Sequence, residues 1–492
     1  MKNAVCLYVL LFCCAAPMQA QPGGRGSTLP TPNEQATLVL QEANELVKAQ
    51  KWPEAEVKVR SAIIMAPGRP ETHAALGYVL FSQRRFAEAE IAYREAARLK
   101  PDNDIFQNQL GMALDRQKKF AEAEASYREA IRLNPVKAQW RVNLAWMLVA
   151  QEKDGGPEFR EAIRLEPKEA EWHVQLGTML LMRRQYNEAE NSLREAIRLK
   201  PEDSDARFNL GQTLFQQAKW SEAETLFRET ARLLPNDVPV QIQLGNVLLA
   251  QNKYVEAETT FRQAMRIDSM SQRAQMGLAH ALFEQQKYAE AEPLYLNATK
   301  QDADNAVSWS WLGQAQGQQG KWVEAEASFR KAVAMKPQSS GAHYWLAQAL
   351  LKQNKLDESN AAFREAGRLR AEEKREFALA TPQTTQPSNT PATGQNIPPA
   401  PDKNFDWNPA LAERAAQSFN TLGNTLFDLN RFEQSAEAFN MATQMAPGNA
   451  RYFANAAGAL IKANQRDKAL EKAREAVKLG LKEHWALKEL GW

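Results

Sequence analysis

KKFAEAEASYREAIRLNP, at residues 118–135, decides how this chain is built, because close copies of it return along the sequence. The copies include RRFAEAEIAYREAARLKP at 84–101, RQYNEAENSLREAIRLKP at 184–201 and AKWSEAETLFRETARLLP at 218–235. Prolines close the phrase every 34 residues or a multiple of 34, except for one 32-residue step: Pro67, Pro101, Pro135, Pro167, Pro201, Pro235 and Pro337. A period of 34 with two helical segments per unit predicts a stacked array of helix pairs.

Each unit carries apolar residues at helical spacing. In the unit at 104–135, Leu110 and Leu114 mark a first helix, while Ala123, Tyr127 and Ala130 follow the i, i+4, i+7 spacing of a second helix. Small residues in both helices let them approach closely, and the aromatic residue at 127 fills the space toward the next unit. Each helix pair is therefore expected to form one layer of a continuous core.

The pattern resembles the tetratricopeptide repeat, whose signature has Leu-Gly or Leu-Ala in the first helix, Ala, an aromatic residue and Ala in the second, and a closing Pro. The Leu of this pair, called here the signature leucine, recurs as Leu76, Leu110, Leu144, Leu176, Leu210, Leu244, Leu278, Leu312, Leu346 and Leu422. The resemblance implies an all-α fold, a right-handed α-solenoid of about twelve stacked helix-turn-helix units.

The repeats also predict the domain organisation. Residues 1–20 are expected to be a signal peptide, 21–33 a disordered segment, and 34–379 an array of about ten repeats. A Pro-, Thr- and Gln-rich stretch at 380–409 reads as a flexible linker. Residues 410–492 are expected to form two further repeats, with HWALKELGW at 484–492 as a capping helix. In the fourth unit, Asp154-Gly155-Gly156-Pro157 replaces the start of the second helix, which predicts a shortened helix.

The first 20 residues differ from everything after them. An early cation at Lys2, an apolar run and small residues before residue 21 predict a secretory signal peptide cleaved after Ala20 or Ala16, the alternative being an uncleaved hydrophobic tail. All three cysteines, Cys6, Cys13 and Cys14, lie in this segment, so the mature chain would contain none. We expect an exported protein, in the periplasm or outside the cell, without a stable transmembrane anchor after signal removal.

The charges are balanced along the chain. There are 61 Lys and Arg against 59 Asp and Glu, with no basic block, which argues against nucleic acid as a partner. Arginines recur in the second helices, and most have a Glu four residues earlier, the favourable order for an ion pair within a helix. We interpret this face as solvated and self-neutralised; the alternative is a stripe that binds an acidic partner.

Residue patterns typical of enzymes are not found. The five histidines are far apart in the sequence, and neither a phosphate-binding glycine loop nor a Gly-x-Ser-x-Gly motif occurs. His73, His173 and His343 share one position with Trp309, three residues before the signature leucine, and are interpreted as packing residues. The sequence therefore predicts no enzyme, no catalytic residues, no cofactor and no metal site.

Five consecutive units carry an amide just before the signature leucine: Gln109, Asn143, Gln175, Asn209 and Gln243. In tetratricopeptide arrays the first helices line a concave groove, and this position points into it. A primary amide offers both a donor and an acceptor, as an extended peptide backbone requires. The series is similar to the asparagine ladder of the O-GlcNAc transferase family, although here Gln alternates with Asn. The alternative is that a polar position on a solvated groove simply prefers amides.

The same position becomes Trp311 and Trp345 further along the chain. Aromatic side chains exposed in a groove are typical anchors for a partner, although packing against a neighbouring first helix would also explain them.

Two functions are compatible with these features. The first is a non-enzymatic scaffold that binds a protein partner, expected to be an extended segment, along the groove between the third and tenth units. The alternative is a glycan-binding or assembly accessory subunit of an envelope polysaccharide or secretion system, suggested by Trp311 and Trp345 and by similarity to repeat subunits of such systems.

Overall fold

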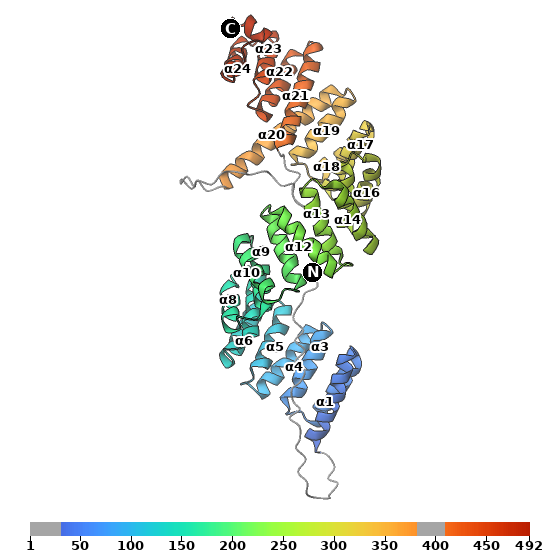
Figure 1. Ribbon diagram of the computed structural model, residues 1–492, viewed down its shortest axis with the longest axis vertical. Coiled ribbons are helices and arrows are strands. Elements are labelled where there is room, and N and C mark those ends of the chain that lie inside the picture. Colours follow the sequence, from blue (N-terminus) through green and yellow to red (C-terminus); the bar gives the residue numbers. More distant parts are fainter. Residues whose placement is uncertain (1–30, 381–408) are drawn as a thin grey trace. The chain divides into compact units, whose positions relative to one another are not determined.

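The computed structural model describes residues 31–380 and 409–492, which form 25 α-helices and no strand (Figure 1). The first twelve are α1 (Pro32–Lys48), α2 (Trp52–Met65), α3 (Pro70–Ser82), α4 (Phe86–Leu99), α5 (Asp104–Arg116), α6 (Phe120–Leu133), α7 (Ala138–Ala150), α8 (Gly156–Leu165), α9 (Ala170–Met182), α10 (Tyr186–Leu199), α11 (Ser204–Gln216) and α12 (Trp220–Leu233). The others are α13 (Val238–Ala250), α14 (Tyr254–Ile267), α15 (Gln272–Glu284), α16 (Tyr288–Gln301), α17 (Ala306–Gln318), α18 (Trp322–Met335), α19 (Ser340–Lys352), α20 (Leu356–Ala380), α21 (Pro409–Asp428), α22 (Phe432–Met445), α23 (Ala450–Lys462), α24 (Arg466–Lys478) and α25 (Trp485–Glu489).

Helices α1 to α24 follow one another as twelve helix-turn-helix pairs, which confirms the predicted solenoid of repeated pairs. We call the odd-numbered member of each pair the first helix and the even-numbered member the second helix. Helix α1 begins at Pro32, after an N-cap at Thr31 whose side chain forms a capping box with Glu34. The array therefore starts slightly before the boundary at residue 34 that the repeat pattern suggests. The predicted signal peptide lies outside the described residues, as does most of the predicted linker.

A left-handed residue makes each turn within a pair. In the second pair, Arg84 has φ 61°, its amide donates to Phe81, and the Arg85 amide donates to the Leu80 carbonyl. These two hydrogen bonds form a Schellman motif, which satisfies carbonyl groups at the end of the first helix. Glycine usually occupies such a position, but here only Gly320 does so among the twelve turns.

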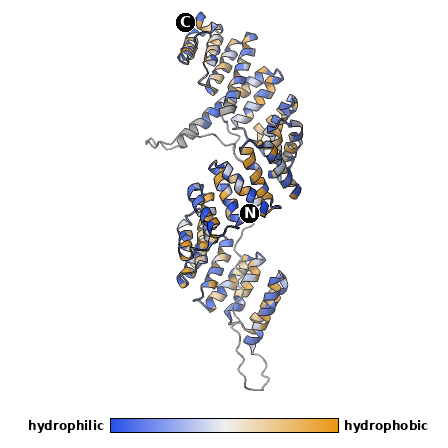
Figure 2. Cartoon of the chain, viewed as in Figure 1, coloured by the Kyte–Doolittle hydropathy of each residue, from blue (hydrophilic) through white to orange (hydrophobic). Residues whose placement is uncertain are grey.

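The close packing predicted from the small residues is present. A Cβ added to Gly245 would lie 2.5 Å from the Phe261 ring, and one added to Gly277 would lie 2.2 Å from it. Phe261 has no exposed surface, and the same second-helix position is also fully buried at Phe227 and Tyr295. Each such ring therefore fills the space between first helices, as expected of one layer in a continuous core. Figure 2 shows apolar and polar residues alternating around the helices.

The fourth pair is shortened as predicted. Helix α8 has 10 residues, against 14 in α6, and Pro157 lies in its first turn. Gly155 is buried, and a Cβ there would lie 2.5 Å from the Ala145 carbonyl oxygen. The glycine therefore lets the chain pass directly against α7 where a first turn of helix is missing.

The chain divides into two units, Met1–Leu176 and Gly177–Trp492, so the division falls beside the shortened pair and not at the predicted linker. Within the second unit, α21 and α22 pack on α19 and α20. The rings of Phe363 and Phe419 are 4.5 Å apart, and Arg364 pairs with Glu437. The last two repeats are thus part of the same stack as the repeats before the predicted linker.

Helix α25 covers the end of this stack. Ala486, Leu487 and Leu490 are buried against α23 and α24, and the Trp485 ring lies over Gly458, where an added Cβ would be 2.4 Å away. Burying these side chains removes apolar surface of the last pair from water.

Candidate partner-binding surface

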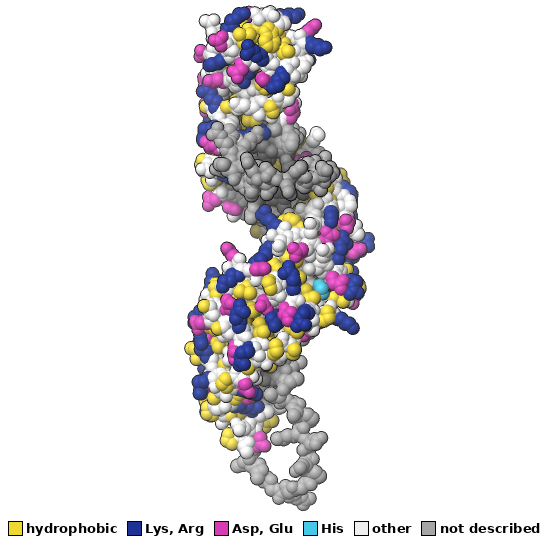
Figure 3. All heavy atoms as spheres, turned by 90° about the vertical axis from the view of Figure 1, so that its left-hand side faces the viewer, with side chains coloured by type: hydrophobic (Ala, Val, Ile, Leu, Met, Phe, Trp, Pro, Cys, Tyr) yellow, Lys and Arg dark blue, Asp and Glu magenta, His cyan; other side chains and the backbone are white. Residues whose placement is uncertain are grey.

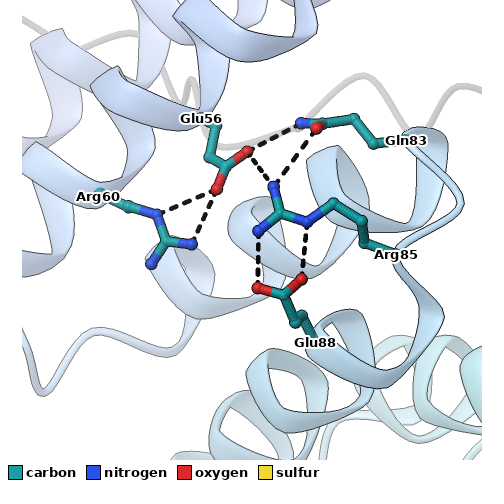
Figure 4. A network of polar contacts seen from close by, with 5 residues as sticks. All are labelled: Glu56, Arg60, Gln83, Arg85 and Glu88. Atoms are coloured by element: carbon teal, nitrogen blue, oxygen red, sulfur yellow. Dashed lines mark hydrogen bonds and ion pairs between the residues drawn. The ribbon is translucent and has the colours of Figure 1, made fainter.

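The second helices present a network of ion pairs, shown for its first occurrence in Figure 4. Glu56 accepts hydrogen bonds from Arg60 in its own helix, and from Gln83 and Arg85 in the turn of the next pair. Arg85 also pairs with Glu88. One carboxylate thus joins two successive helix pairs.

The same arrangement returns along the array. In four later pairs a glutamate accepts hydrogen bonds from an arginine four residues on, and from a glutamine and a lysine of the next turn. The first two are Glu90, with Arg94, Gln117 and Lys119, and Glu224, with Arg228, Gln251 and Lys253. The other two are Glu258, with Arg262, Gln285 and Lys287, and Glu326, with Arg330, Gln353 and Lys355. The predicted ion pairs within helices are therefore confirmed. The links to the next pair were not predicted, because a single sequence does not show which repeat residues meet across a turn.

These contacts shift the pKa of the glutamates. Burial alone would raise the pKa of Glu224 and Glu258, but the hydrogen bonds from lysine, arginine and glutamine outweigh it and lower both values to about 2. The arginines make a second link, as in Arg228 to Glu256 at 2.6 Å. On the face shown in Figure 3, cationic and anionic side chains are intermixed, as expected of a self-neutralised surface.

Residues three before the signature leucine have a structural role. His73, His343 and Trp309 each have a ring nitrogen 2.8–3.0 Å from the carbonyl oxygen six residues earlier, at Pro67, Pro337 and Ala303. Gln241 and Gln275 make the same contact with the carbonyls of residues 235 and 269. In these five first helices the position therefore ties the start of the helix to the residue that closes the preceding repeat.

The first helices lie closer to one another than the second helices do. In the second unit, α11 contacts α13, α13 contacts α15, α17 contacts α19, and α19 contacts α21; among second helices only α20 and α22 contact comparably within the described residues. A curved stack has its more closely spaced helices on the inner side. We call the residue before the signature leucine, with the residues three and six positions further on, the inner strip of each first helix.

Inner strips of neighbouring helices touch. The Asn209 amide donates to Thr178 Oγ1 at 3.0 Å, and the His280 ring lies 4.4 Å from the Trp311 ring. Both contacts join the first strip position of one helix to the second strip position of the helix before it. The strips of α9 and α11, and those of α15 and α17, are therefore in contact within the second unit.

The predicted amides lie on the inner strips, and three of them, Asn143, Gln175 and Asn209, bond to a neighbouring first helix. Asn143 Nδ2 donates to Asn108 Oδ1 at 2.8 Å, and Gln139 donates to Asn143 Oδ1 at 3.0 Å. Gln109 is partly exposed, but its Oε1 is buried and has no hydrogen-bond partner. The Asn143 side chain thus bridges α5 and α7, a role that neither interpretation of the sequence predicts.

The other three amides are held in similar ways. Gln175 Oε1 accepts from Trp146 Nε1 at 2.7 Å, and its amide nitrogen contacts Glu171. Gln243 Oε1 accepts from Asn246 at 3.4 Å. Gln109, Asn143 and Gln175 belong to the first unit, and Asn209 and Gln243 belong to the second. The five amides are therefore two separate sets, one in each unit.

Trp311 and Trp345 are partly exposed and are packed against second helices. The Trp311 ring stacks on Tyr295 with planes 13° apart, and the Trp345 ring stacks on Phe329 with planes 15° apart. Tyr295 Oη also lies 3.0 Å from His280 Nδ1, and burial lowers the pKa of His280 to about 4, which leaves the ring neutral near pH 7. One face of each indole is therefore covered by the core.

Sequence reasoning missed several residues of this surface. Asn420 Oδ1 accepts from Asn455 Nδ2 at 2.8 Å, at the repeat positions that Asn108 and Asn143 occupy. Gln212, His280 and Gln348 are partly exposed strip residues. Reading the third residue after the position before each signature leucine, at the spacing of one helix face, would have found Gln212, His280 and Gln348.

Two further properties bear on the chemistry of the described residues. Among the residues that the structure describes, no group of three or more His, Cys, Asp or Glu side chains is placed to hold a metal ion. No helix within 31–380 or 409–492 combines the length and apolar character needed to cross a membrane.

Comparison with known proteins identifies the repeat. Models described as tetratricopeptide repeat match residues 40–104, 105–135, 180–244, 248–314, 312–372 and 420–483, which together make up well over half of the chain. The shortened pair at α7 and α8 falls in the gap at 136–179. No curated protein matches the sequence.

The solved structures that match this chain have low sequence identity to it. They include PilF of Pseudomonas aeruginosa (20% identity, 43% of this chain and 96% of that chain, TM-score 0.37) and the APC/C hetero-tetramer Cut9–Hcn1 (12%, 93% and 96%, 0.38). YrrB, described as having an unusual peptide-binding site, is 22% identical over 37% of this chain and 95% of that chain, with a TM-score of 0.32. The signature residues, the helix pairs and the matching models agree that the chain belongs to the tetratricopeptide repeat family.

Proposed function

We propose that the chain is a non-enzymatic scaffold that binds a protein partner along the inner strips of α11 to α19. The observation that carries this proposal is that the inner strip presents partly exposed amides, such as Gln212 and Gln348, and that the side-chain bond of Gln348 goes to Tyr344 of its own helix and not to a neighbouring repeat. The leucines, small residues and buried rings hold the helices together, whereas the strip can vary with what it binds. Proteins of this family generally mediate protein–protein interactions.

An extended segment suits the arrangement of the surface. The strip crosses successive first helices, whose side chains touch at Thr178 and Asn209 and again at His280 and Trp311. Amides on it have remaining donors and acceptors: Gln348 Nε2, for example, makes one bond, to Tyr344 Oη at 3.3 Å. A peptide backbone can use such groups at intervals along its length.

The cell envelope is the proposed location, with the protein exported to the periplasm or beyond the cell. This part rests on the signal-peptide pattern of residues 1–20. The absence of catalytic activity is proposed from the family, whose members are generally non-catalytic scaffolds.

A glycan-binding or assembly role in an envelope polysaccharide or secretion system is the second candidate. It rests on Trp311 and Trp345, because a sugar ring commonly lies flat on an indole. Since Tyr295 and Phe329 already cover one face of each ring, and His280 and Tyr344 lie edge-on beside them, we rank this candidate below peptide binding.

A matched pair of variants tests the binding surface. Gln212→Glu with Gln348→Glu places two charges on the inner strip, and Thr225→Glu with Thr259→Glu places two on exposed positions of second helices. Affinity capture from an envelope extract is then followed by titration of any retained protein against each variant. We expect the strip variant to lose a protein that the wild type and the outer variant retain. Equal binding by all three would refute the proposed surface.

A further inference from the structure

The inner strips of α11 to α19 contain no charged residue, although 24% of the chain is Asp, Glu, Lys or Arg. Their fifteen positions are Asn209, Gln212, Phe215, Gln243, Asn246, Leu249, Gly277, His280, Phe283, Trp311, Gln314, Gly317, Trp345, Gln348 and Leu351. Five of them, Phe215, Asn246, Gly277, Gln314 and Gly317, are buried, so the other ten, which are partly exposed, form the surface that a partner can reach. His280 is the only one that can titrate near neutral pH, and burial keeps it uncharged there. The intervening second helices each carry three to five charged residues.

Charged residues of these first helices lie toward their ends. Arg273 and Glu284 stand at either end of α15, Lys352 ends α19, and Asp205 begins α11 beside Arg207. Helices α13 and α17 contain none. Charged residues therefore flank the strip on α11, α15 and α19, whereas on α13 and α17 the whole helix is uncharged.

From this distribution we propose that the partner segment is an extended peptide whose contacting residues are uncharged; this inference rests on the proposed function. A Lys or Glu side chain seated on the strip would lose water and meet only amides, indoles and aliphatic groups. An unpaired charge removed from water is strongly unfavourable, so a segment with charged contact residues is rejected. Neutral residues bind through hydrogen bonds to the amides and through apolar contact with Phe283, Leu249 and Leu351.

The same distribution decides between peptide classes. An acidic or basic peptide would find complementary charges at the ends of some first helices and on the second helices, where Arg228, Arg262 and Arg330 are already paired with two carboxylates each. Breaking those pairs offsets any gain from new ones. Specificity on the inner strip therefore comes from the rejection of charged peptide residues as much as from the contacts that neutral residues make.

The test uses an array of random 12-residue peptides, probed with the full chain, beside an array of neutral oligosaccharides. We expect the bound peptides to be depleted of Asp, Glu, Lys and Arg. In the best binder, replacing a contacting residue by Lys should weaken binding about tenfold or more. Raising NaCl from 50 to 500 mM should change its Kd by less than about twofold, because screening acts on charges.

The strip variant Gln212→Glu with Gln348→Glu sharpens the test. It should bind the neutral peptide at least about tenfold more weakly, and regain affinity for the Lys-substituted peptide, because its new carboxylates supply the missing partner. The outer variant Thr225→Glu with Thr259→Glu should behave as wild type. Circular dichroism melting of both variants separates loss of binding from loss of folding.

Other outcomes overturn the inference in distinguishable ways. If charged peptides are selected and the strip variant still loses them, the peptide-binding function stands but its neutral specificity is wrong. If only neutral oligosaccharides bind, or if only the outer variant loses binding, both the neutral-peptide inference and the proposed function fail.

Discussion

The second helices and the inner strips of the first helices contact neighbouring repeats through different kinds of side chain. On the second helices, a glutamate such as Glu224 accepts hydrogen bonds from a lysine, an arginine and a glutamine, so that here and in several other pairs one repeat is tied to the next by charge. On the inner strip, the contacts between helices are made by amides and rings, as at Asn209 and Trp311. The outer face is thus committed to holding the stack, whereas the inner strip retains partly exposed groups that a partner can use.

The core between the two surfaces should dominate stability. Phe261 has no exposed surface and lies against both Gly245 and Gly277, so Phe261→Ala should destabilise the second unit by about 3–5 kcal/mol. Urea unfolding followed by circular dichroism measures this. Thr259→Ala, an exposed change on the same helix, is the control and should stay within about 0.5 kcal/mol of wild type. Similar losses for both would contradict the assigned core.

The network of ion pairs on the second helices should contribute more to the free energy of unfolding than the inner strip does. Glu224→Ala leaves Lys253 and Gln251 without their shared acceptor and should cost about 1–3 kcal/mol. Gln212→Ala, on the strip of the adjacent first helix, should change the free energy of unfolding by less than about 0.5 kcal/mol. A reversed order in urea unfolding would mean that the strip, and not the outer face, links the repeats.

Acid should weaken the outer face selectively. The pKa of Glu224 and Glu258 is about 2 in the folded chain, against 4.5 as the ordinary value, so the folded state binds fewer protons between these values. Their contribution to stability is present above about pH 4.5 and is lost as the pH falls toward 2. Urea midpoints measured from pH 7 to pH 2.5 should fall less steeply for Glu224→Gln with Glu258→Gln than for wild type. Parallel curves would contradict the assigned shifts.

The bridging amides should contribute less to stability than the core or the ion pairs of the second helices. Asn143→Ala removes the hydrogen bonds with Asn108 and Gln139 and should cost about 1 kcal/mol in the first unit. Asn143→Asp keeps the acceptor but loses the donor to Asn108, so it should also destabilise. If Asn143→Ala has the same free energy of unfolding as the wild type, the amide does not link the two helices and is available to a partner.

The sequence alone predicted the architecture well, because leucine, small residues and buried rings repeat at fixed positions that only one packing satisfies. It also predicted the shortened α8 from Gly155-Gly156-Pro157 and the ion pairs within second helices. It did not predict that Glu56 would meet Gln83 and Arg85, since contacts between repeats depend on the twist from one pair to the next. For the same reason it placed Asn143 on an inner surface without showing that it bridges two helices.

The aromatic strip residues illustrate the same limit. An aromatic residue at the strip position is expected both when the ring anchors a partner and when it packs against the core, so the sequence does not distinguish the two roles. Only the neighbouring Tyr295 and Phe329 rings show that Trp311 and Trp345 are partly consumed by packing. Gln212 and Gln348 match no repeat motif in the sequence. They are identified as surface residues only from the contacts between the inner strips of neighbouring helices.

Site-specific photo-crosslinking tests the central claim most directly. A photoreactive residue is placed singly at Gln212, Gln348, Thr225 or Thr259 in the full chain, and each variant is irradiated with the best neutral peptide from the array. We expect crosslinks from Gln212 and Gln348 and none above background from Thr225 or Thr259. Crosslinks from the two threonine positions alone would place the partner on the charged second helices and contradict the account.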